Sequence, residues 1–514
     1  MLDLSEIPFG IVTDLIRQHA REIPSHPALI DPAKQLDYAS LDALMDRVAA
    51  SLQRDGLRAG DAIALCATMS VDYAAVFLGA LRAGVVVAPL APGSTPTALA
   101  RMQQDASAKL LFLDAAAADT MGPAAPGNPP RIALDASSAG TALDTWLAAP
   151  GAKPTPVTPE PNWPFNIIYS SGTTGDPKGI VQGHGMRWAH VQRGAKYEYG
   201  GPDGVTLLST PLYSNTTLVI FFPTLGFGGT VVLMPKFDAG AYLKLAEKHR
   251  VTHTMLVPVQ YQRLMAHPAF DQHDLSSYKF KFSTSAPFGA ALKADVLKRW
   301  PGGLVEFYGM TEGGGTCILE AHLTPHKLHT VGQPASGHDI RLIDDEGMQV
   351  GPGESGEVVG HSIGMMSGYH GQPEKTREAE WFDPQGKRFI RTGDVGRFDD
   401  EGFLTLFDRK KDMVISGGFN IYPSDLEAVV RGHAAVADVA VVGVPSESWG
   451  ETPVAFVVRC PGDDTPAEAL LQWANGQVGK TQRLAELRFI DELPRSAIGK
   501  VLKRELRDGF VAAR

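Results

Sequence analysis

The chain has 514 residues, enough for about three domains of roughly 150 residues each. Lys and Arg number 47 against 57 Asp and Glu, a formal net charge of −10, which argues against a general nucleic-acid-binding protein. The three cysteines, Cys66, Cys317 and Cys460, show no CxxC or zinc spacing, so the sequence predicts no disulfide scaffold and favours a reduced, cytoplasmic setting.

The first part of the chain alternates helix and strand patterns. Asp3 and Glu6 stand where a secretory signal has basic residues, so no signal is predicted. Apolar spacing then predicts a helix over 41–55, a strand over 62–66, a helix over 71–83 and a strand over 85–89. Further along, the composition predicts a surface excursion over 115–130, a proline-rich connector over 148–164 and a strand over 165–169. This alternation is typical of a doubly wound α/β layer with parallel strands.

An uncharged stretch over 205–235 is long enough to span a bilayer. Pro211, Pro223 and Gly226 interrupt it, and Ser, Thr and Asn residues are mixed in. Because a lipid-exposed backbone must satisfy its own hydrogen bonds, the sequence favours buried strands and a short helix around a pocket. No integral membrane segment is predicted.

The C-terminal part changes character. Residues 330–408 contain many Gly-centred turns and are predicted to be β-rich. The segment DRKKD then precedes a tail of about 100 residues, a size suited to a small separate domain. Within this tail the patterns predict a helix over 424–431, strands over 436–444 and 454–458, and a helix over 467–475. The sequence therefore predicts an α/β protein with a large domain, 1–408, of doubly wound sheets plus a β-rich subdomain, and a small α+β domain, 409–514.

The strongest local signal is YSSGTTGDPKG at 169–179. A predicted strand leads into a loop whose glycines, hydroxyls and Lys178 offer N–H groups, O–H groups and a cation to phosphate oxygens. It is not a Walker loop, because Asp176 and Pro177 separate Gly175 from the lysine. In isolation this loop leaves a plain surface turn open as an alternative.

Five further motifs follow in order: SAP at 285–287, YGMTE at 308–312, RTGD at 391–394, DRKKDMVISGGFNIYPSDLE at 408–427 and PRSAIGKVLKREL at 494–506. Together with the glycine-rich loop they resemble the signatures of the adenylate-forming superfamily of acyl- and aryl-CoA synthetases, luciferases and peptide-synthetase adenylation domains. The resemblance is to a class I acyl-CoA ligase and covers nearly the whole chain. It implies ATP, Mg²⁺ and coenzyme A as reactants and a small C-terminal domain that moves.

The motifs also make chemical sense. YGMTE ends the apolar run LVEF, which places it at the carboxyl end of a strand, where α/β sheets bind ligands. Tyr308 offers a flat face to a purine, Thr311 can hydrogen-bond a phosphate, and Glu312 is a hard oxygen ligand suited to Mg²⁺. The resemblance implies that Asp394 accepts hydrogen bonds from both ribose hydroxyls and that Arg409 contacts the ribose or a phosphate. It implies a nucleotide site of Ser170, Ser171, Gly172, Thr173, Thr174, Gly175, Lys178, Ser285, Ala286, Pro287, Tyr308, Gly309, Asp394 and Arg409.

The C-terminal motifs carry the remaining roles. The resemblance implies that Lys500 is the catalytic lysine, with Thr311 and Glu312 as its catalytic partners. A mobile ammonium can bridge the attacking carboxylate and the α-phosphate of ATP. Lys411 corresponds to the hinge of the family, and Gly417 and Gly418 resemble glycines that line its pantetheine tunnel. Glycine suits such a tunnel because the backbone must approach a thin ligand closely.

The acyl group is expected among apolar side chains. The resemblance implies a pocket of Tyr213, Ser214, Met255, Phe307, Gly309, Gly314 and Gly315, with Val219, Phe221 and Phe222 from the uncharged stretch beside it. Ser214 stands where many relatives have a histidine, which weakens the transfer of a His-lined pocket. The glycines at 313–315 replace larger side chains, so either space for a bulky acyl group or a flexible loop is expected. Because no Lys or Arg is in this set, dicarboxylic acids are expected to be rejected.

Several histidines are weaker signals. His322, His326 and His329 have the spacing HxxxHxxH, but Pro325 interrupts any helix and no acidic or Cys ligand completes a set, so no metal site is predicted. His184 follows the glycine-rich loop, and both a packed core position and a contact with the acyl or nucleotide site stay open.

The sequence therefore favours an ATP-dependent carboxylic acid–CoA ligase of fatty acid metabolism, acting on a hydrophobic fatty or aryl-alkyl monocarboxylic acid. One alternative is a stand-alone adenylation enzyme that loads a carrier protein. The other is a catalytically inactive nucleotide-binding regulator, against which the retained Lys500, Glu312 and Asp394 argue. The expected partner is a small-molecule acid, no nucleic acid is expected, and a homodimer is left open. The sequence does not identify the acid.

Overall fold

The computed structural model describes residue 4 and residues 7–124, 127–170, 178–199, 201–416, 419–496 and 499–512, without the side chains of residues 170, 419, 420 and 481. Two compact units divide the chain. The first comprises Met1–His329, Pro334–Asp339 and Gly360–Ile390, and the second Thr330–Gln333, Ile340–Val359 and Arg391–Arg514. The division after residue 408 stays a prediction of the sequence.

An eight-stranded sheet in the first unit contains the strands predicted near the N-terminus. Its central strands β4, β3 and β5 are parallel, and β8 joins β4 in parallel before β9 turns back antiparallel. The order is β19-β9-β8-β4-β3-β5-β6-β7. The strands are β3 (Ala62–Cys66), β4 (Val86–Pro89), β5 (Ala108–Leu113), β6 (Arg131–Ala133), β7 (Thr141–Ala142), β8 (Pro164–Ser170), β9 (Lys178–Gly183) and β19 (Gly368–Tyr369).

A nine-stranded sheet forms the second layer of this unit. Five neighbouring pairs, from β1–β11 to β13–β14, are parallel, so their carboxyl ends lie at one edge. The order is β16-β15-β14-β13-β12-β10-β11-β1-β2. The strands are β1 (Pro27–Ile30), β2 (Gln35–Asp37), β10 (Val205–Leu208), β11 (Thr230–Leu233), β12 (His253–Leu256), β13 (Phe280–Ser283), β14 (Gly303–Gly309), β15 (Thr316–Glu320) and β16 (Gln333–Pro334).

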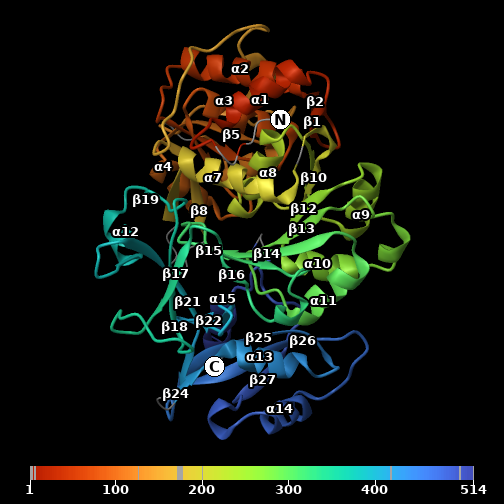
Figure 1. Cartoon of the computed structure of the whole chain (residues 1–514), viewed down its shortest axis with the longest axis vertical. Coiled ribbons are helices and arrows are strands. Elements are labelled where there is room, and N and C mark those ends of the chain that lie inside the picture. The colour runs from red at the N-terminus through yellow and green to blue at the C-terminus, as the bar shows by residue number, and fades with distance from the viewer. Residues whose placement is uncertain are drawn as a thin grey trace. The chain divides into compact units, whose positions relative to one another are not determined.

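Helices connect and cover these strands, and one hydrophobic core joins residues from both sheets with α2, α3 and α8. In Figure 1, α1, α2 and α3 lie together beside the N-terminus. The helices of this unit are α1 (Val12–Glu22), α2 (Tyr38–Arg54), α3 (Val71–Arg82), α4 (Pro96–Asp105), α5 (Ala115–Met121), α6 (Leu143–Trp146), α7 (His184–Gly194), α8 (Asn215–Gly226), α9 (Ala239–Lys248), α10 (Pro258–Met265), α11 (Ala290–Arg299) and α12 (Pro373–Glu378). Within the surface excursion predicted over 115–130 the structure has a short helix, α5, which Asp114 caps by accepting the Ala117 N–H.

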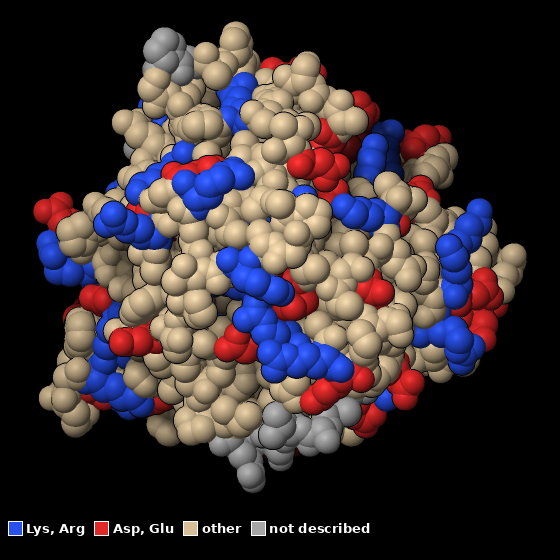
Figure 2. Space-filling model, turned by 90° about the horizontal axis from the view of Figure 1, so that it is seen from above, with Lys and Arg blue, Asp and Glu red and all other residues tan. Residues whose placement is uncertain are grey.

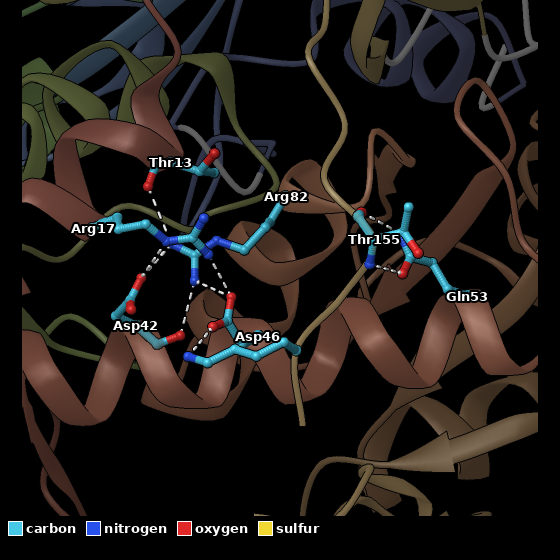
Figure 3. A network of polar contacts seen from close by, with 8 residues as sticks. Thr13, Arg17, Asp42, Asp46, Gln53, Arg82 and Thr155 are labelled. Carbon is cyan, nitrogen blue, oxygen red and sulfur yellow. Dashed lines mark hydrogen bonds and ion pairs between the residues drawn. The ribbon is translucent and has the colours of Figure 1, made fainter. Parts of the chain in front are cut away.

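A buried ion cluster ties the first three helices together (Figure 3). The carboxylate of Asp46 in α2 is 1% exposed. It forms ion pairs with Arg82 of α3 at 2.8 Å, with Arg17 of α1 at 2.6 Å and with Lys153 of the connector at 2.7 Å. Asp42 of α2 also pairs with Arg82, at 2.6 Å. Burial alone would raise the pKa of Asp46, but the Lys153 hydrogen bond and the Arg82 and Arg17 charges outweigh it and lower the pKa. The cluster therefore holds Asp46 ionised inside the protein.

The uncharged stretch 205–235 is a buried part of the core, as expected. It forms β10, α8 and β11, and Phe221 and Phe222 are fully buried. Among the described residues, no helix combines the length and the apolarity needed to cross a membrane. On the face of the molecule drawn in Figure 2, acidic and basic side chains are interspersed.

The remaining strands form two five-stranded sheets. The first contains β17 (Asp339–Ile343), β18 (Gly356–His361), β20 (Glu380–Phe382), β21 (Arg388–Phe398) and β22 (Leu404–Arg409), and the boundary between the units falls within β17, β18 and β21. The second belongs to the second unit: β23 (Val414–Ser416), β24 (Phe419–Ile421), β25 (Val436–Ser446), β26 (Gly450–Arg459) and β27 (Glu486–Phe489). Three helices complete that unit: α13 (Pro423–Arg431), α14 (Ala467–Gly476) and α15 (Lys503–Ala512). The helices and strands predicted in the tail are confirmed within a few residues.

Candidate active site

One group of predicted residues in the first unit lies at the carboxyl edge of the nine-stranded sheet. Ser285 follows β13, and Tyr308 and Gly309 end β14 just before Thr311 and Glu312. Tyr213 and Ser214 follow β10. Because β10, β12, β13 and β14 are parallel neighbours, the sheet gathers these predicted residues at one edge, as the motif YGMTE indicated.

Glu312 has a fixed partner that the sequence did not reveal. The Tyr369 hydroxyl donates to Glu312 Oε1 at 2.8 Å, and the Met366 N–H donates to the Glu312 carbonyl at 2.8 Å. Lys178 Nζ lies 4.9 Å from the centroid of the Tyr369 ring. Burial raises the pKa of Tyr369, and the Glu312 charge raises it further, so the hydroxyl keeps its proton and donates. The structure thus brings together Lys178 and Glu312, two predicted residues, around one tyrosine.

A buried network of polar side chains supports the loop that carries Thr311. Gln182 Nε2 donates to the Thr311 carbonyl at 2.7 Å, and Asn166 Nδ2 donates to Gln182 Oε1 at 2.9 Å. Arg187 donates to Asn166, to Asn215 at 2.8 Å and to Gln182. These amide partners are neutral, and the burial of Arg187 lowers its pKa to about 9. The network positions the loop and was missed because its members come from separate elements.

Ser285 adopts an unusual backbone conformation. Its φ of +80° lies in the left-handed region, which non-glycine residues rarely occupy. Its hydroxyl is 2.6 Å from the hydroxyl of Thr216, in the first turn of α8. Backbone strain of this kind is retained where surrounding structure enforces it, often at functional sites. Ala286 and Pro287 follow in the same loop.

The residues predicted for the acyl pocket differ in their surroundings. Ser214 caps α8, Met255 is 1% exposed in β12, and the Phe307 ring stacks on Phe282 with centroids 5.6 Å apart. Phe221 and Phe222 are core residues, since Phe222 packs on Phe77 and Phe165 rather than facing an open space. The roles of Tyr213, Ser214, Met255 and Phe307 stay predictions.

The expectation that the glycines at 313–315 leave space is wrong at two of them. A Cβ on Gly314 would lie 2.6 Å from the Cβ of Ile390 and 3.2 Å from the Gly360 carbonyl oxygen. A Cβ on Gly313, whose φ is +74°, would collide with the carbonyl of Gly364. These glycines allow two backbones to pack closely. Gly315, with φ +95°, needs glycine for its conformation, and its place in the pocket stays a prediction.

A separate group of predicted residues lies in the second unit. Asp394 and Arg409 are register partners on β21 and β22, and Arg409 Nε lies 3.1 Å from Asp394 Oδ1. The pKa of Lys500 is lowered to about 8, first by burial and then by the charges of Arg409 and Lys411, while the charges of Asp394 and Asp412 oppose this shift. Four predicted residues, Asp394, Arg409, Lys411 and Lys500, therefore form one charged cluster.

The segments that carry this cluster are anchored to each other. The Ser496 N–H donates to the Lys500 carbonyl at 2.8 Å. Asp408 accepts the Ser424 N–H at 2.9 Å and lies 4.0 Å from Lys503, which also pairs with Glu427 at 2.8 Å. The Ser424 hydroxyl donates to the Phe407 carbonyl. These contacts join β22 to α13 and α15.

Some predicted residues lie outside the described part of the chain. They are Ser171, Gly172, Thr173, Thr174 and Gly175 of the glycine-rich loop and Gly417 and Gly418 of the proposed tunnel. Ser170 ends β8, directly before that loop. The roles of these residues stay predictions.

His184 and His322 pack against aromatic rings in the protein. His184 is 6% exposed and its ring packs edge-on against Phe165, with centroids 4.9 Å apart, and burial lowers its pKa to about 4. His322 contacts the Leu304 carbonyl at 3.1 Å through Nδ1 and packs on Phe280. Across the described residues, no group of three or more His, Cys, Asp or Glu side chains could hold a metal ion.

Comparison with known proteins identifies the family. The AMP-binding enzyme model matches residues 16–370, and the model of the AMP-binding enzyme C-terminal domain matches residues 425–500. The chain belongs to the AMP-binding enzyme family. The resemblance seen in the motifs is confirmed, and the fold is that of adenylate-forming enzymes.

Similar proteins match this AMP-binding enzyme over nearly its whole length. A feruloyl-CoA synthase from Amycolatopsis sp is 34% identical over 507 residues, which cover 96% of this chain and 98% of the relative. The fatty acid–[acyl-carrier-protein] ligase ScoC from Streptomyces coeruleorubidus is 31% identical over 506 residues, 96% of this chain and 95% of ScoC. The crystal structure of ATP-bound MatB from Rhodopseudomonas palustris superposes with a TM-score of 0.84 at 29% identity, covering 97% of this chain and 99% of MatB.

Proposed function

We propose that this AMP-binding enzyme is an ATP-dependent carboxylic acid–CoA ligase acting on a fatty or aryl-alkyl acid. The observation that carries the proposal is the cluster of Lys500, Asp394 and Arg409, in which a lysine of lowered pKa lies among the residues expected to bind ribose and phosphate. The feruloyl-CoA synthase supports coenzyme A as the thiol, and ScoC keeps a carrier protein open as the acceptor. A cytoplasmic location and a homodimeric assembly stay predictions of the sequence.

The reaction has two steps. In the first, a carboxylate oxygen attacks the α-phosphorus of Mg·ATP, the bond to pyrophosphate breaks, and an acyl-adenylate forms. Lys500 bridges the two anions as they approach, and Asp394 accepts the ribose hydroxyls. In the second, the sulfur of coenzyme A attacks the acyl carbonyl, the thiol proton is lost, and AMP leaves. Adenylation is needed because a carboxylate oxygen is by itself a poor leaving group.

The residues around Glu312 fit the magnesium ion of Mg·ATP. Mg²⁺ commonly binds one or two carboxylates and takes its other ligands from phosphates and water. Glu312 supplies one carboxylate at the strand edge, and Tyr369 occupies only its Oε1 with a hydrogen bond. The second oxygen of Glu312 is therefore the proposed ligand, and we place no further protein ligand on the ion.

We expect Glu312→Gln to slow adenylation by about tenfold or more and to raise the Mg²⁺ concentration needed for half-maximal rate. The amide keeps an oxygen that can accept from Tyr369, so the loss reports the charge rather than the position of the loop. Initial rates of pyrophosphate release over a Mg²⁺ titration provide the measurement. Glu320→Gln, the same change at a residue paired with Lys196, is the control. An unchanged Mg²⁺ dependence would exclude Glu312 as a ligand.

Lys411 is proposed as the hinge about which the small domain turns between the two steps. Proline fixes φ near −65°, so we expect Lys411→Pro to hold the adenylation conformation. Pyrophosphate release in the first turnover should survive while CoA ester output falls by about tenfold or more. Lys411→Ala, which removes the side chain but not the backbone freedom, should keep both steps. An equal loss of both steps in the proline variant would contradict a hinge at this position.

One experiment tests the function as a whole. Pyrophosphate and AMP release are measured with a panel of fatty, aryl-alkyl and dicarboxylic acids, each with coenzyme A, with an acyl carrier protein and with neither. A CoA ligase releases pyrophosphate with its acid and needs coenzyme A for turnover to AMP. Turnover with the carrier protein alone would support the stand-alone adenylation enzyme instead. The absence of pyrophosphate release with every acid would favour the inactive nucleotide-binding regulator.

A further inference from the structure

Helix α7 carries four basic residues at a spacing of three, His184, Arg187, His190 and Arg193, which places neighbouring members of the series on one side of the helix. The guanidinium of Arg187 donates hydrogen bonds to neutral amide side chains and so supports the loop of Thr311. Arg193, near the end of the helix, has different surroundings and no role in the chemistry described above.

Arg193 is placed against the predicted acyl pocket. Its guanidinium carbon lies 5.2 Å from the centroid of the Phe307 ring, a cation–π contact. Burial lowers the pKa of Arg193, and only the hydroxyls of Tyr197 and Tyr199 oppose this. Within the described part of the chain Arg193 makes no ion pair with a carboxylate, whereas Lys196, three residues later, pairs with Glu320 at 2.9 Å. The side chain of Arg193 is half-buried. A guanidinium that is partly withdrawn from water without a counter-charge is costly, which suggests that a ligand supplies the charge.

Two histidines share this environment. Burial lowers the pKa of His190, and the charges of Arg193 and Arg187 lower it further. Burial also lowers the pKa of His338 to about 4, with a further contribution from Arg193, so both rings are neutral at pH 7. The Thr316 N–H donates to His338 Nδ1 at 2.9 Å, which leaves the ring proton on Nε2 as a donor. Thr316 directly follows Gly314 and Gly315, so His338 adjoins a second predicted segment of the pocket.

We propose that the acid substrate carries a second carboxylate at the far end of its hydrophobic body, and that Arg193 binds this group with His338 and His190 beside it. The proposal rests on the proposed function and names its substrate class. It reverses the expectation that dicarboxylic acids are rejected, because that expectation came from a set of pocket residues without Arg193. A guanidinium matches a carboxylate with two parallel hydrogen bonds, so Arg193 would set both specificity and orientation.

The test compares matched pairs of acids that differ only in the second carboxylate. Straight-chain monocarboxylic acids are paired with α,ω-dicarboxylic acids of equal length, and phenylpropanoate is paired with its 4-carboxy derivative. The kcat/KM for CoA-dependent AMP release is measured for wild type, Arg193→Met, Arg193→Lys and Lys196→Met. The last is the matched control, since it removes a positive charge close by from an exposed residue that already has a carboxylate partner.

Wild type should prefer the dicarboxylic member of its best pair. Arg193→Met should lower the ratio of diacid to monoacid kcat/KM by at least about thirtyfold, leaving the monoacid value nearly unchanged, because the second carboxylate loses the partner of a charge pair that is largely shielded from water. Arg193→Lys should retain part of the ratio, and Lys196→Met should retain all of it. The ratio is taken within one protein preparation, so a smaller folded fraction does not change it.

Two results would overturn the proposal while leaving the ligase function intact. One is a wild-type preference for the monocarboxylic acid in every pair. The other is an equal loss on both members of a pair in Arg193→Met, which would make Arg193 a structural residue. A protein that activates no acid of either kind would instead refute the proposed function, and this proposal with it.

Discussion

Replacing Lys500 by alanine is expected to lower the rate of adenylation by a factor of about 10² to 10³, the usual cost of one preorganised donor at a developing charge. Thioester formation from supplied acyl-adenylate and coenzyme A should continue, because in that step the bond between the acyl carbon and the AMP oxygen breaks and no carboxylate has to approach the α-phosphorus. Single-turnover pyrophosphate release and thioester formation measure the two steps separately. If thioester formation falls as far as adenylation, the role assigned to Lys500 is wrong.

The pH dependence of adenylation is a second test of the role of Lys500. Because the pKa of Lys500 is about 8 and the cation is the active form, kcat/KM for adenylation should be full below this value and fall as the pH rises through it. Lys500→Arg, whose guanidinium stays charged, should move the falling limb to higher pH even if the rate is lower. Lys503→Arg, at a residue already paired with Glu427, is the control and should leave the profile unchanged.

Replacing Asp46 by alanine is expected to lower the free energy of unfolding of the first unit by about 3–5 kcal/mol. The substitution leaves Arg82, 6% exposed, with one carboxylate fewer and frees Arg17 and Lys153 of their shared partner. Urea unfolding followed by tryptophan fluorescence gives the measurement, and Asp119→Ala on exposed helix surface is the control. The double variant Asp46→Leu with Arg82→Met should regain part of the loss, because it removes the stranded charge.

The same cluster predicts how acid weakens the protein. The pKa of Asp46 is lowered in the folded state, so its contribution is fully present above the unfolded value of about 3.9 and is lost as the pH falls through the folded value. Wild type should therefore lose more stability than Asp46→Asn when the pH is lowered through this range. Equal acid sensitivity of the two proteins would show that Asp46 is not held ionised.

Local signals were sufficient for much of the fold. The strand over 62–66 and the helix beginning at Val71 were predictable because their apolar spacing matches the period of each structure. The place of YGMTE at a strand end was predictable because the motif follows the apolar run LVEF, and β14 ends at Gly309, the second residue of the motif. Helix α5 was not predicted, because the Gly and Pro residues that follow it dominated the composition of 115–130, although its alanines favour a helix and Asp114 caps it.

The parts of the site that could not be predicted depend on residues distant in sequence. Tyr369 is 57 residues from Glu312, and Gln182 is 129 residues from Thr311, so no motif contains both members of either pair. The close approach of Gly314 to Ile390 and Gly360 likewise follows from tertiary packing. Arg193 was missed for the same reason: its helix position is visible in the sequence, but its neighbour Phe307 comes from another element.

The contacts of Asp408 have a consequence for the timing of the catalytic cycle. Phe407 and Asp408 precede Lys411, while their partners Ser424 and Lys503 follow it. If the chain pivots at Lys411, these contacts lie across the pivot and must separate for the turn to occur. The strength of these contacts would then set how much of the enzyme rests with the small domain in one orientation, and the free-energy barrier to its turn into the other. Weakening them, for example with Ser424→Ala, would change how long the enzyme waits between its two half-reactions without touching either group of reacting atoms.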